Sequence, residues 1–140
     1  IQIDAVVKGH VASGSGATRA RLTLQYRGAT LAHQWGLDFN ISAGTISVID
    51  ESGNWVEIAS GLGLLITSSP FLMRLAVNPL LPQYMLAGIG STVVQPIPVK
   101  PPTASVAKPG LLEVQLRFES AVNSALAPAI SWVRAAYIPP

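Results

Sequence analysis

Two histidines, His10 and His33, are the side chains in this sequence best suited to binding a transition metal or moving a proton near neutral pH. They lie in different segments. Neither has a second histidine four residues away or a nearby pair of carboxylates, which a helix-borne zinc site requires. We therefore expect no metal site at either position. His33 shares an alternating face with Trp35, which favours a packed histidine with a satisfied hydrogen bond.

Asp50, Ser52 and Asn54 place an oxygen-bearing side chain at every second position of a polar loop, as calcium-binding turns do. Gly53 does not match the EF-hand pattern, which needs glycine at the sixth loop position and glutamate at the twelfth. A solvated loop is the simpler interpretation. The polar run separates the β-branched stretches 46–49 and 55–58, so it predicts the turn of a β-hairpin.

Seven carboxylates are available to form the acid and base pair of a glycoside hydrolase. They are Asp4, Asp38, Asp50, Glu51, Glu57, Glu113 and Glu119. Glu57, Glu113 and Glu119 occupy outward positions of amphipathic segments, where a charged solvent-facing surface is the ordinary explanation. The sequence does not predict a catalytic pair, and we expect neither enzyme activity nor a cofactor.

Two short segments look like known functional motifs, but neither supports a catalytic, phosphate-binding or glycosylation site. Residues 12–16 read Ala-Ser-Gly-Ser-Gly, but they lack the Gly-x-Ser-x-Gly pattern of a nucleophile elbow and the Gly-Lys-Ser/Thr of a phosphate loop. A flexible turn is expected there. Asn40-Ile41-Ser42 fits a glycosylation sequon, a triplet that arises often by chance and matters only in a secreted eukaryotic chain.

Three tryptophans, Trp35, Trp55 and Trp132, carry a flat aromatic face of the kind that stacks on sugar rings. Packing in the core is the ordinary role of such residues. Trp55 adjoins the polar hairpin loop and Trp35 lies in a neighbouring segment, so these two are the candidate exposed aromatics.

Residues 95–110 are unusually rich in proline. The prolines are Pro96, Pro98, Pro101, Pro102 and Pro109. Proline lacks a backbone N–H and favours an extended conformation, so this segment cannot be a central strand. It is either a long surface loop or an arm laid on a neighbouring subunit, since a preformed extended chain loses little entropy on docking.

The elements that position these residues follow a period of two, which is the period of a β-strand. Residues 18–26, 31–41 and 111–119 alternate apolar and polar side chains, and 130–138 reads as a final strand. Weaker strand candidates are 1–7, 62–67, 71–77, 84–89 and 92–99, and one short helix fits 120–126. We expect a single all-β domain over 1–140, an antiparallel β-sandwich of about 8–10 strands, with a jelly roll as the favoured topology.

The composition limits the kinds of partner that we expect for this chain. Charged residues make up 11% of the chain, against about 25% in an average soluble domain. The chain is 49% hydrophobic with a net charge of +2, which disfavours intrinsic disorder. Its 9 Lys and Arg residues barely outnumber 7 Asp and Glu and form no basic cluster, so we expect no nucleic-acid partner. Prolines and Arg74 interrupt the apolar region 61–90, so we expect no membrane span. Much of so weakly charged a surface is expected to contact other protein. The first residue is Ile1 rather than Met, so we expect that leading residues are missing.

In its general layout this chain resembles the single jelly-roll capsid and decoration proteins of prokaryotic viruses. The segments that carry the resemblance are the amphipathic strands at 18–26 and 111–119, the hairpin at 50–54 and the proline-rich arm at 96–109. The resemblance implies a virion structural subunit whose partners are copies of itself and other shell proteins. Two alternatives remain: a carbohydrate-binding, lectin-like module, which would be extracellular, and a virus tail or adhesin domain that forms rings or trimers.

Overall fold

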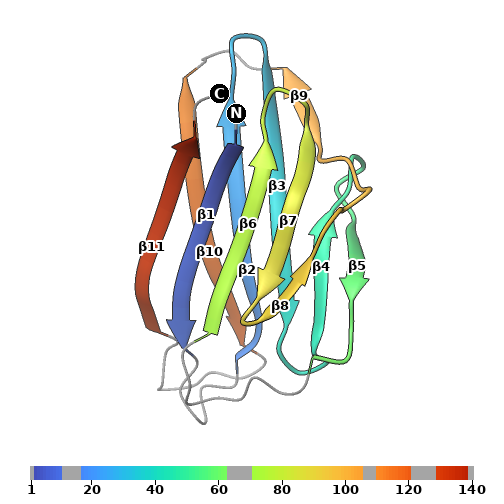
Figure 1. Ribbon diagram of the computed structural model, residues 1–140, viewed down its shortest axis with the longest axis vertical. Coiled ribbons are helices and arrows are strands. Elements are labelled where there is room, and N and C mark those ends of the chain that lie inside the picture. Colours follow the sequence, from blue (N-terminus) through green and yellow to red (C-terminus); the bar gives the residue numbers. More distant parts are fainter. Residues whose placement is uncertain (1, 11–16, 63–70, 106–109, 121–128, 139–140) are drawn as a thin grey trace.

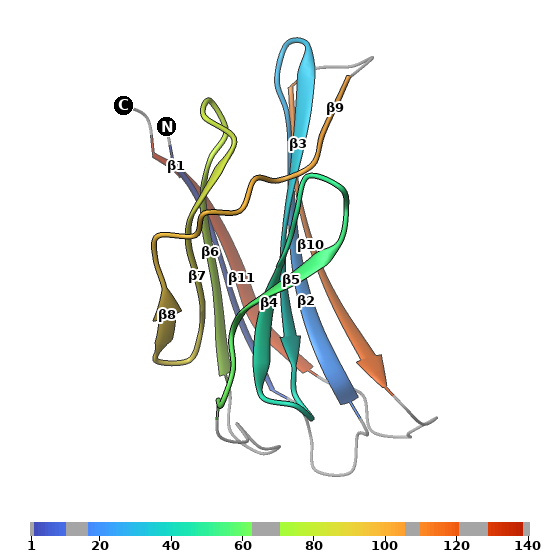
Figure 2. The ribbon, with the colours of Figure 1, turned by 90° about the vertical axis from the view of Figure 1, so that its right-hand side faces the viewer.

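The computed structural model describes residues 2–10, 17–62, 71–105, 110–120 and 129–138. In these ranges the chain forms eleven strands in two antiparallel sheets that face each other (Figures 1 and 2). Sheet A has the order β11 (Ala129–Ile138), β1 (Gln2–His10), β6 (Phe71–Asn78), β7 (Gln83–Ile89) and β8 (Thr92–Val94). Sheet B has the order β10 (Leu111–Ser120), β2 (Ala17–Arg27), β3 (Leu31–Asn40), β4 (Thr45–Ile49) and β5 (Trp55–Ala59), and β9 (Thr103–Ser105) also pairs with β3.

The alternating segments form strands with one buried and one outer face, as predicted. In β2, Ala20, Leu22 and Leu24 are fully buried, while the Arg, Thr and Gln residues between them are only partly buried. In β3, Trp35, Leu37 and Phe39 belong to the core between the sheets, and several residues of the opposite face are buried as well, so this strand is covered on both faces. The all-β sandwich predicted from the sequence is therefore confirmed.

The core lies between the two sheets. Sheet B contributes Trp35 and Phe39, and sheet A contributes Met73 and Phe71, all of them buried. The Phe71 ring joins the layers, because it packs edge-on against Phe39 of β3 at 5.9 Å and against Phe118 of β10 at 6.4 Å. Edge-to-face pairs at these separations stabilise an interface beyond the area they bury.

The strand pairing is nested from the ends of the chain inward. β1 pairs with β11, β2 with β10, and β3 with β9, while β2, β3, β4 and β5 also form a meander within sheet B. This order is that of a β-sandwich. It does not by itself establish a jelly roll, and that finer assignment stays a prediction.

Several expected element bounds differ from the structure. The segment expected at 92–99 is a strand only to Val94, and a separate short strand, β9, forms at 103–105, so the described chain has one strand more than the upper expectation. Most of the expected strand at 62–67 and most of the short helix at 120–126 lie outside the described residues. None of the described residues belongs to a helix long and apolar enough to cross a membrane.

Candidate interaction site

The proline-rich segment crosses from sheet A to sheet B. It leaves β8 at Gln95 and reaches β9 at Thr103, passing along one side of the sandwich (Figure 2). Its side chains alternate: Ile97 is 5% exposed within the core, while Pro96 and Pro98 are exposed. Ile97 forms a bridge with Tyr84 of β7, which fastens the segment to sheet A. The crossing is thus part of its own domain, with one apolar edge turned inward.

The other end of the crossing is fastened to sheet B. The backbone N–H of Gln34 donates a hydrogen bond to the carbonyl oxygen of Pro102 (3.2 Å), and Pro101 is buried. The extended conformation expected for 95–102 is consistent with these contacts. Pro109 lies outside the described residues. The outward Pro96 and Pro98 leave a surface on which a neighbour can dock, so the arm stays a proposal for that outer edge.

An apolar groove of about 550 Å³ runs beside the crossing. It lies between the β6–β7 turn and the crossing, and its lining residues are Leu81, Pro82, Gln83, Tyr84, Pro96, Ile97, Pro98, Val99 and Lys100. Leu81, one of the lining residues, is 60% exposed, and Leu80, which precedes it in the same turn, is 63% exposed. Contiguous exposed apolar surface of this kind marks interaction sites in soluble proteins.

The turn that presents the two leucines is held by a side chain. Asn78 Oδ1 accepts hydrogen bonds from the backbone N–H groups of Leu80 (3.0 Å) and Leu81 (3.2 Å). An Asn oxygen bonded to the backbone two and three residues on is a local turn motif that orders the chain without tertiary contacts. The leucine side chains therefore project outward from an ordered turn.

Tyr84, which lines the groove, spans the sandwich from sheet A to sheet B. Its hydroxyl oxygen accepts hydrogen bonds from the backbone N–H groups of Gly36 (3.0 Å) and Ile49 (3.2 Å), and its O–H donates to the carbonyl oxygen of Ile49 (2.9 Å). The β3–β4 ladder ends at the pair Leu37 and Val48, so Gly36 and Ile49 would be the next pair. The phenol hydroxyl takes the place of the backbone hydrogen bonds that this pair does not form.

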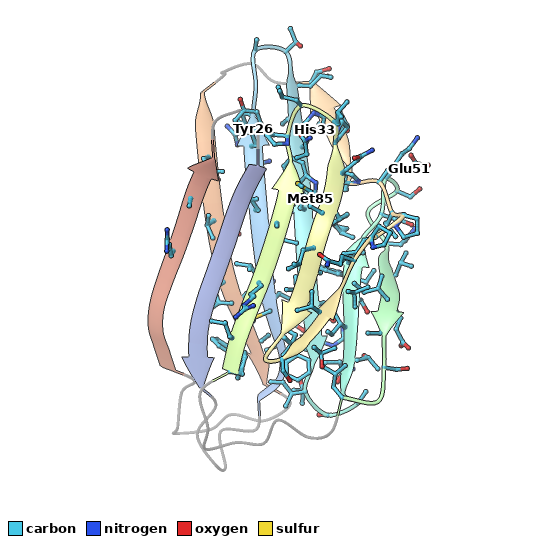
Figure 3. All side chains as sticks on the ribbon, in the orientation of Figure 1. Tyr26, His33, Glu51 and Met85 are labelled. Carbon is cyan, nitrogen blue, oxygen red and sulfur yellow. The ribbon has the colours of Figure 1, made fainter. Side chains whose placement is uncertain are left out.

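A β-bulge in β7 is what turns Tyr84 inward. Leu86 lies opposite Ala76 and Tyr84 lies opposite Val77, so Met85 is the extra residue on the bulged strand (Figure 3). Ala87 is fully buried, and simple alternation would have turned Met85 to the core instead of Tyr84. Burial raises the pKa of the Tyr84 phenol far above its usual value, with smaller effects from its backbone hydrogen bonds and from Asp50.

The outer face of sheet B carries a charged cluster around Arg21. Its guanidinium contacts Asp38 Oδ1 at 2.8 Å and Glu119 Oε1 at 2.6 Å, and it lies 5.1 Å from the centre of the Trp55 ring. Asp38 is buried although it alternates with the core residues of β3, because Arg21 and its neighbours cover it. The end of the Trp55 ring rests on Gly36, where a Cβ atom would lie 2.6 Å from Trp55 Cη2.

The candidate aromatics have different positions. Trp35 is fully buried, so the idea that it is exposed is wrong, and the preferred role in the core is confirmed. Among the described residues its Nε1 has no hydrogen-bond partner. Trp55 is only half-buried, on the outer face of sheet B. Trp132 lies in β11.

His33 is the packed histidine that the sequence predicts. Its ring lies 5.7 Å from the Trp35 ring, and Nδ1 is 3.0 Å from Thr103 Oγ1, a hydrogen bond between β3 and β9. Figure 3 shows it near Tyr26 toward the β2–β3 hairpin end of the sandwich. Burial lowers the pKa of His33. His10 is the last residue of β1.

The hairpin predicted at 50–54 is confirmed between β4 and β5. Asp50 Oδ1 accepts hydrogen bonds from the backbone N–H groups of Ser52 (2.9 Å) and Asn54 (2.8 Å), and Gly53 takes a φ of 85°. This Asp50 oxygen is engaged in ordering the turn, while Glu51 projects from its tip (Figure 3). No group of three metal-ligating side chains occurs within the described ranges.

The remaining candidates are dispersed. Glu57 is exposed on β5, Glu113 is half-buried on β10, and Asp4 belongs to β1. Asn40 of the sequon accepts a hydrogen bond from the backbone N–H of Ala43 (3.0 Å) in the β3–β4 turn. Residues 12–16 lie outside the described part of the chain. Asp38 and Glu119 are brought together by their shared contact with Arg21, and Asp50 and Glu51 are neighbours in the β4–β5 turn.

The exposed leucine pair and its groove were not predicted from the sequence. The signal that could have found them is Asn78-Pro79-Leu80-Leu81-Pro82, in which two prolines place two apolar residues in a turn. No protein-family model, no curated protein and no solved structure matches this chain. The geometry of the chain itself is therefore the basis for a functional assignment.

Proposed function

We propose that this chain is a structural subunit that acts by protein–protein assembly, and that its setting is a virion shell, as a capsid or decoration protein. The observation that carries the proposal is the exposed pair Leu80 and Leu81 on an ordered turn beside an apolar groove. A low content of charged residues, 11%, supports it, because few charges oppose close contact between copies.

The leucine pair supplies a useful contact energy. Complete burial of a leucine side chain contributes about 1.5–3 kcal/mol relative to full exposure. Since each leucine is about 60% exposed, docking the pair into a neighbour contributes about 2–4 kcal/mol before the entropy of association is subtracted. Repeated at every contact of a symmetric assembly, this is enough to bias many weakly charged subunits toward association.

Sedimentation velocity over a wide concentration range tests the proposal. We expect the wild-type protein to form species larger than a monomer, and the double variant Leu80→Asp/Leu81→Asp to weaken them by at least about tenfold in dissociation constant. Leu31→Asp is the matched control, since Leu31 is also exposed but lies on sheet B. A clean wild-type monomer at the highest concentration would overturn the proposal. Electron microscopy of the assembly separates a shell from the rings or trimers of a tail protein.

A sugar-binding function is the second candidate, and Trp55 is the observation that favours it. Trp55 is half-buried on the outer face of sheet B, where Arg21 and a polar hollow lined by Thr23, Gln25 and Gln34 offer hydrogen-bond donors and acceptors. Binding on a glycan array that is lost in Trp55→Phe, with the oligomeric mass unchanged, would favour this function over assembly.

A further inference from the structure

Strand β10 forms one margin of sheet B. It pairs with β2 along its length, and within the described residues no strand pairs with its other side (Figure 1). An edge strand of ten residues presents a row of unpaired backbone N–H and C=O groups, which is a template for another strand. Natural proteins usually shorten, bend or cover so long an edge.

The side chains of β10 alternate in a way that a second copy can match. Glu113, Gln115 and Arg117 lie on the outer face, and Arg117 has 74% of its side chain exposed. The intervening positions are apolar: Val114 and Leu116 are half-buried. The strand thus continues the inner and outer faces of sheet B to its edge.

Of the registers of two antiparallel β10 strands with an axis at Val114, Gln115 or Leu116, the one at Gln115 keeps both faces and also sets opposite charges across from each other. With a two-fold axis at Gln115, Glu113 of each copy lies opposite Arg117 of the other, and Val114 lies opposite Leu116. A shift by one residue would set polar positions opposite apolar ones. A two-fold axis at Leu116 would set Glu113 opposite Glu119, and like charges directly opposite each other are destabilising.

The contacts that Glu113 and Arg117 make within their own chain leave both side chains able to pair with a second copy. Arg117 Nε lies 3.7 Å from Glu119 Oε1, while Arg21 contacts the same oxygen at 2.6 Å. Glu119 is thus already neutralised within its own chain. Within the part of the chain that the structure describes, the one side-chain contact of Glu113 is a hydrogen bond from the side-chain amide of Gln115. Each copy therefore offers Glu113 and Arg117 to a strand across the edge, and these two residues lie two positions before and two positions after Gln115.

We propose that β10 pairs antiparallel with β10 of a second copy about a two-fold axis at Gln115, so that two sheets B become one continuous sheet. The partner is this same chain. The inference rests on the proposed function only in assuming that the chain associates with itself. It names a contact distinct from the leucine turn, and a symmetric contact of this kind closes on a dimer.

A charge exchange tests the register. Glu113→Arg places arginine at both 113 and 117, and Arg117→Glu places glutamate at both, so each variant alone meets like charges across the axis. We expect the dissociation constant of each single variant to rise about tenfold or more at low salt. An equimolar mixture of the two should form a heterodimer, because each Arg then meets a Glu. The double variant Glu113→Arg/Arg117→Glu should dimerise as the wild type does.

Native mass spectrometry and sedimentation distinguish the outcomes, with circular dichroism confirming the fold of each variant. Glu57→Arg is the matched control, because Glu57 is exposed on the outer face of β5, the opposite margin of sheet B. If the wild type associates but the singles, the mixture and the double variant all behave like it, the β10 contact is wrong and the proposed assembly function stands. If the wild type is monomeric throughout, both fail.

Discussion

Replacement of Tyr84 by phenylalanine removes one oxygen atom that joins the two sheets. That hydroxyl accepts from the N–H groups of Gly36 and Ile49 and donates to the carbonyl of Ile49, at distances of 2.9–3.2 Å. Without it, two N–H groups and one carbonyl remain at the point where β3 and β4 separate. Each buried backbone group left without a partner costs about 1–3 kcal/mol.

We expect Tyr84→Phe to lower the free energy of unfolding by about 3–5 kcal/mol. This is less than the sum for three unpaired groups, because water reaches the half-buried backbone groups of Ile49 and offsets part of the penalty. That is a large share of the 5–15 kcal/mol typical of a folded domain, and it corresponds to a fall in Tm of about 10–15 °C. Urea unfolding followed by far-UV circular dichroism measures it. Tyr26→Phe is the control, because within the described chain Tyr26 is half-buried without a hydroxyl hydrogen bond, so its loss should stay below about 1 kcal/mol.

The same substitution has an alkaline signature. Burial raises the pKa of folded Tyr84, whereas in the unfolded chain a tyrosine ionises near pH 10. The unfolded state therefore loses a proton first, and wild-type stability should fall as the pH rises above about 10. Tyr84→Phe should lack this contribution and show a shallower alkaline decline. If Tyr84→Phe and Tyr26→Phe lower the free energy of unfolding equally at neutral pH, the Tyr84 hydroxyl does not join β3 and β4 as described.

Three further predictions concern buried groups. Burial lowers the pKa of folded His33 below the unfolded value near 6.5, so stability should fall as the pH drops below about 6.5, and His33→Gln should flatten that decline in urea titrations between pH 7 and 5. Asp38→Asn removes the buried carboxylate charge that Arg21 contacts at 2.8 Å and should lower the free energy of unfolding by about 2–3 kcal/mol, whereas Glu57→Gln at an exposed site should change it by less than about 0.5 kcal/mol. Gly36→Ala places a methyl group against the Trp55 ring and should cost about 1–3 kcal/mol, with a shift in tryptophan fluorescence if the ring is displaced.

Local alternation predicted the strands well because it depends on neighbours in the chain. The pattern of Leu22, Leu24 and their polar neighbours is enough to orient β2, and Asp50 to Asn54 are enough to place the β4–β5 hairpin. His33 was predicted as a core residue for the same reason. These features need no information about which strands become neighbours in space.

The features that the sequence did not predict depend on long-range pairing. Asp38 follows the polar face of β3, and its burial requires Arg21 from the adjacent strand and a crowded outer face. Tyr84 reaches the core only because of the bulge at Met85, which no local pattern signals. Ile97 enters the core because the chain crosses between sheets at that point. Topology, rather than local propensity, determines each of them.

The nested pairing of strands has a consequence for the time the chain needs to fold. In sheet A, Gln2 lies opposite Ile138, and in sheet B, Arg21 lies opposite Arg117, so the pairing at one margin of each sheet joins residues about a hundred positions apart or more. Closing such large loops loses chain entropy before contacts compensate for it, and sandwiches with distant pairings accordingly fold in milliseconds to seconds. During synthesis β1 and β2 emerge long before β11 and β10, which pair with them at the margins of the sheets. Until β10 and β11 follow, the nascent chain exposes apolar strand faces that a chaperone or a neighbouring copy can capture.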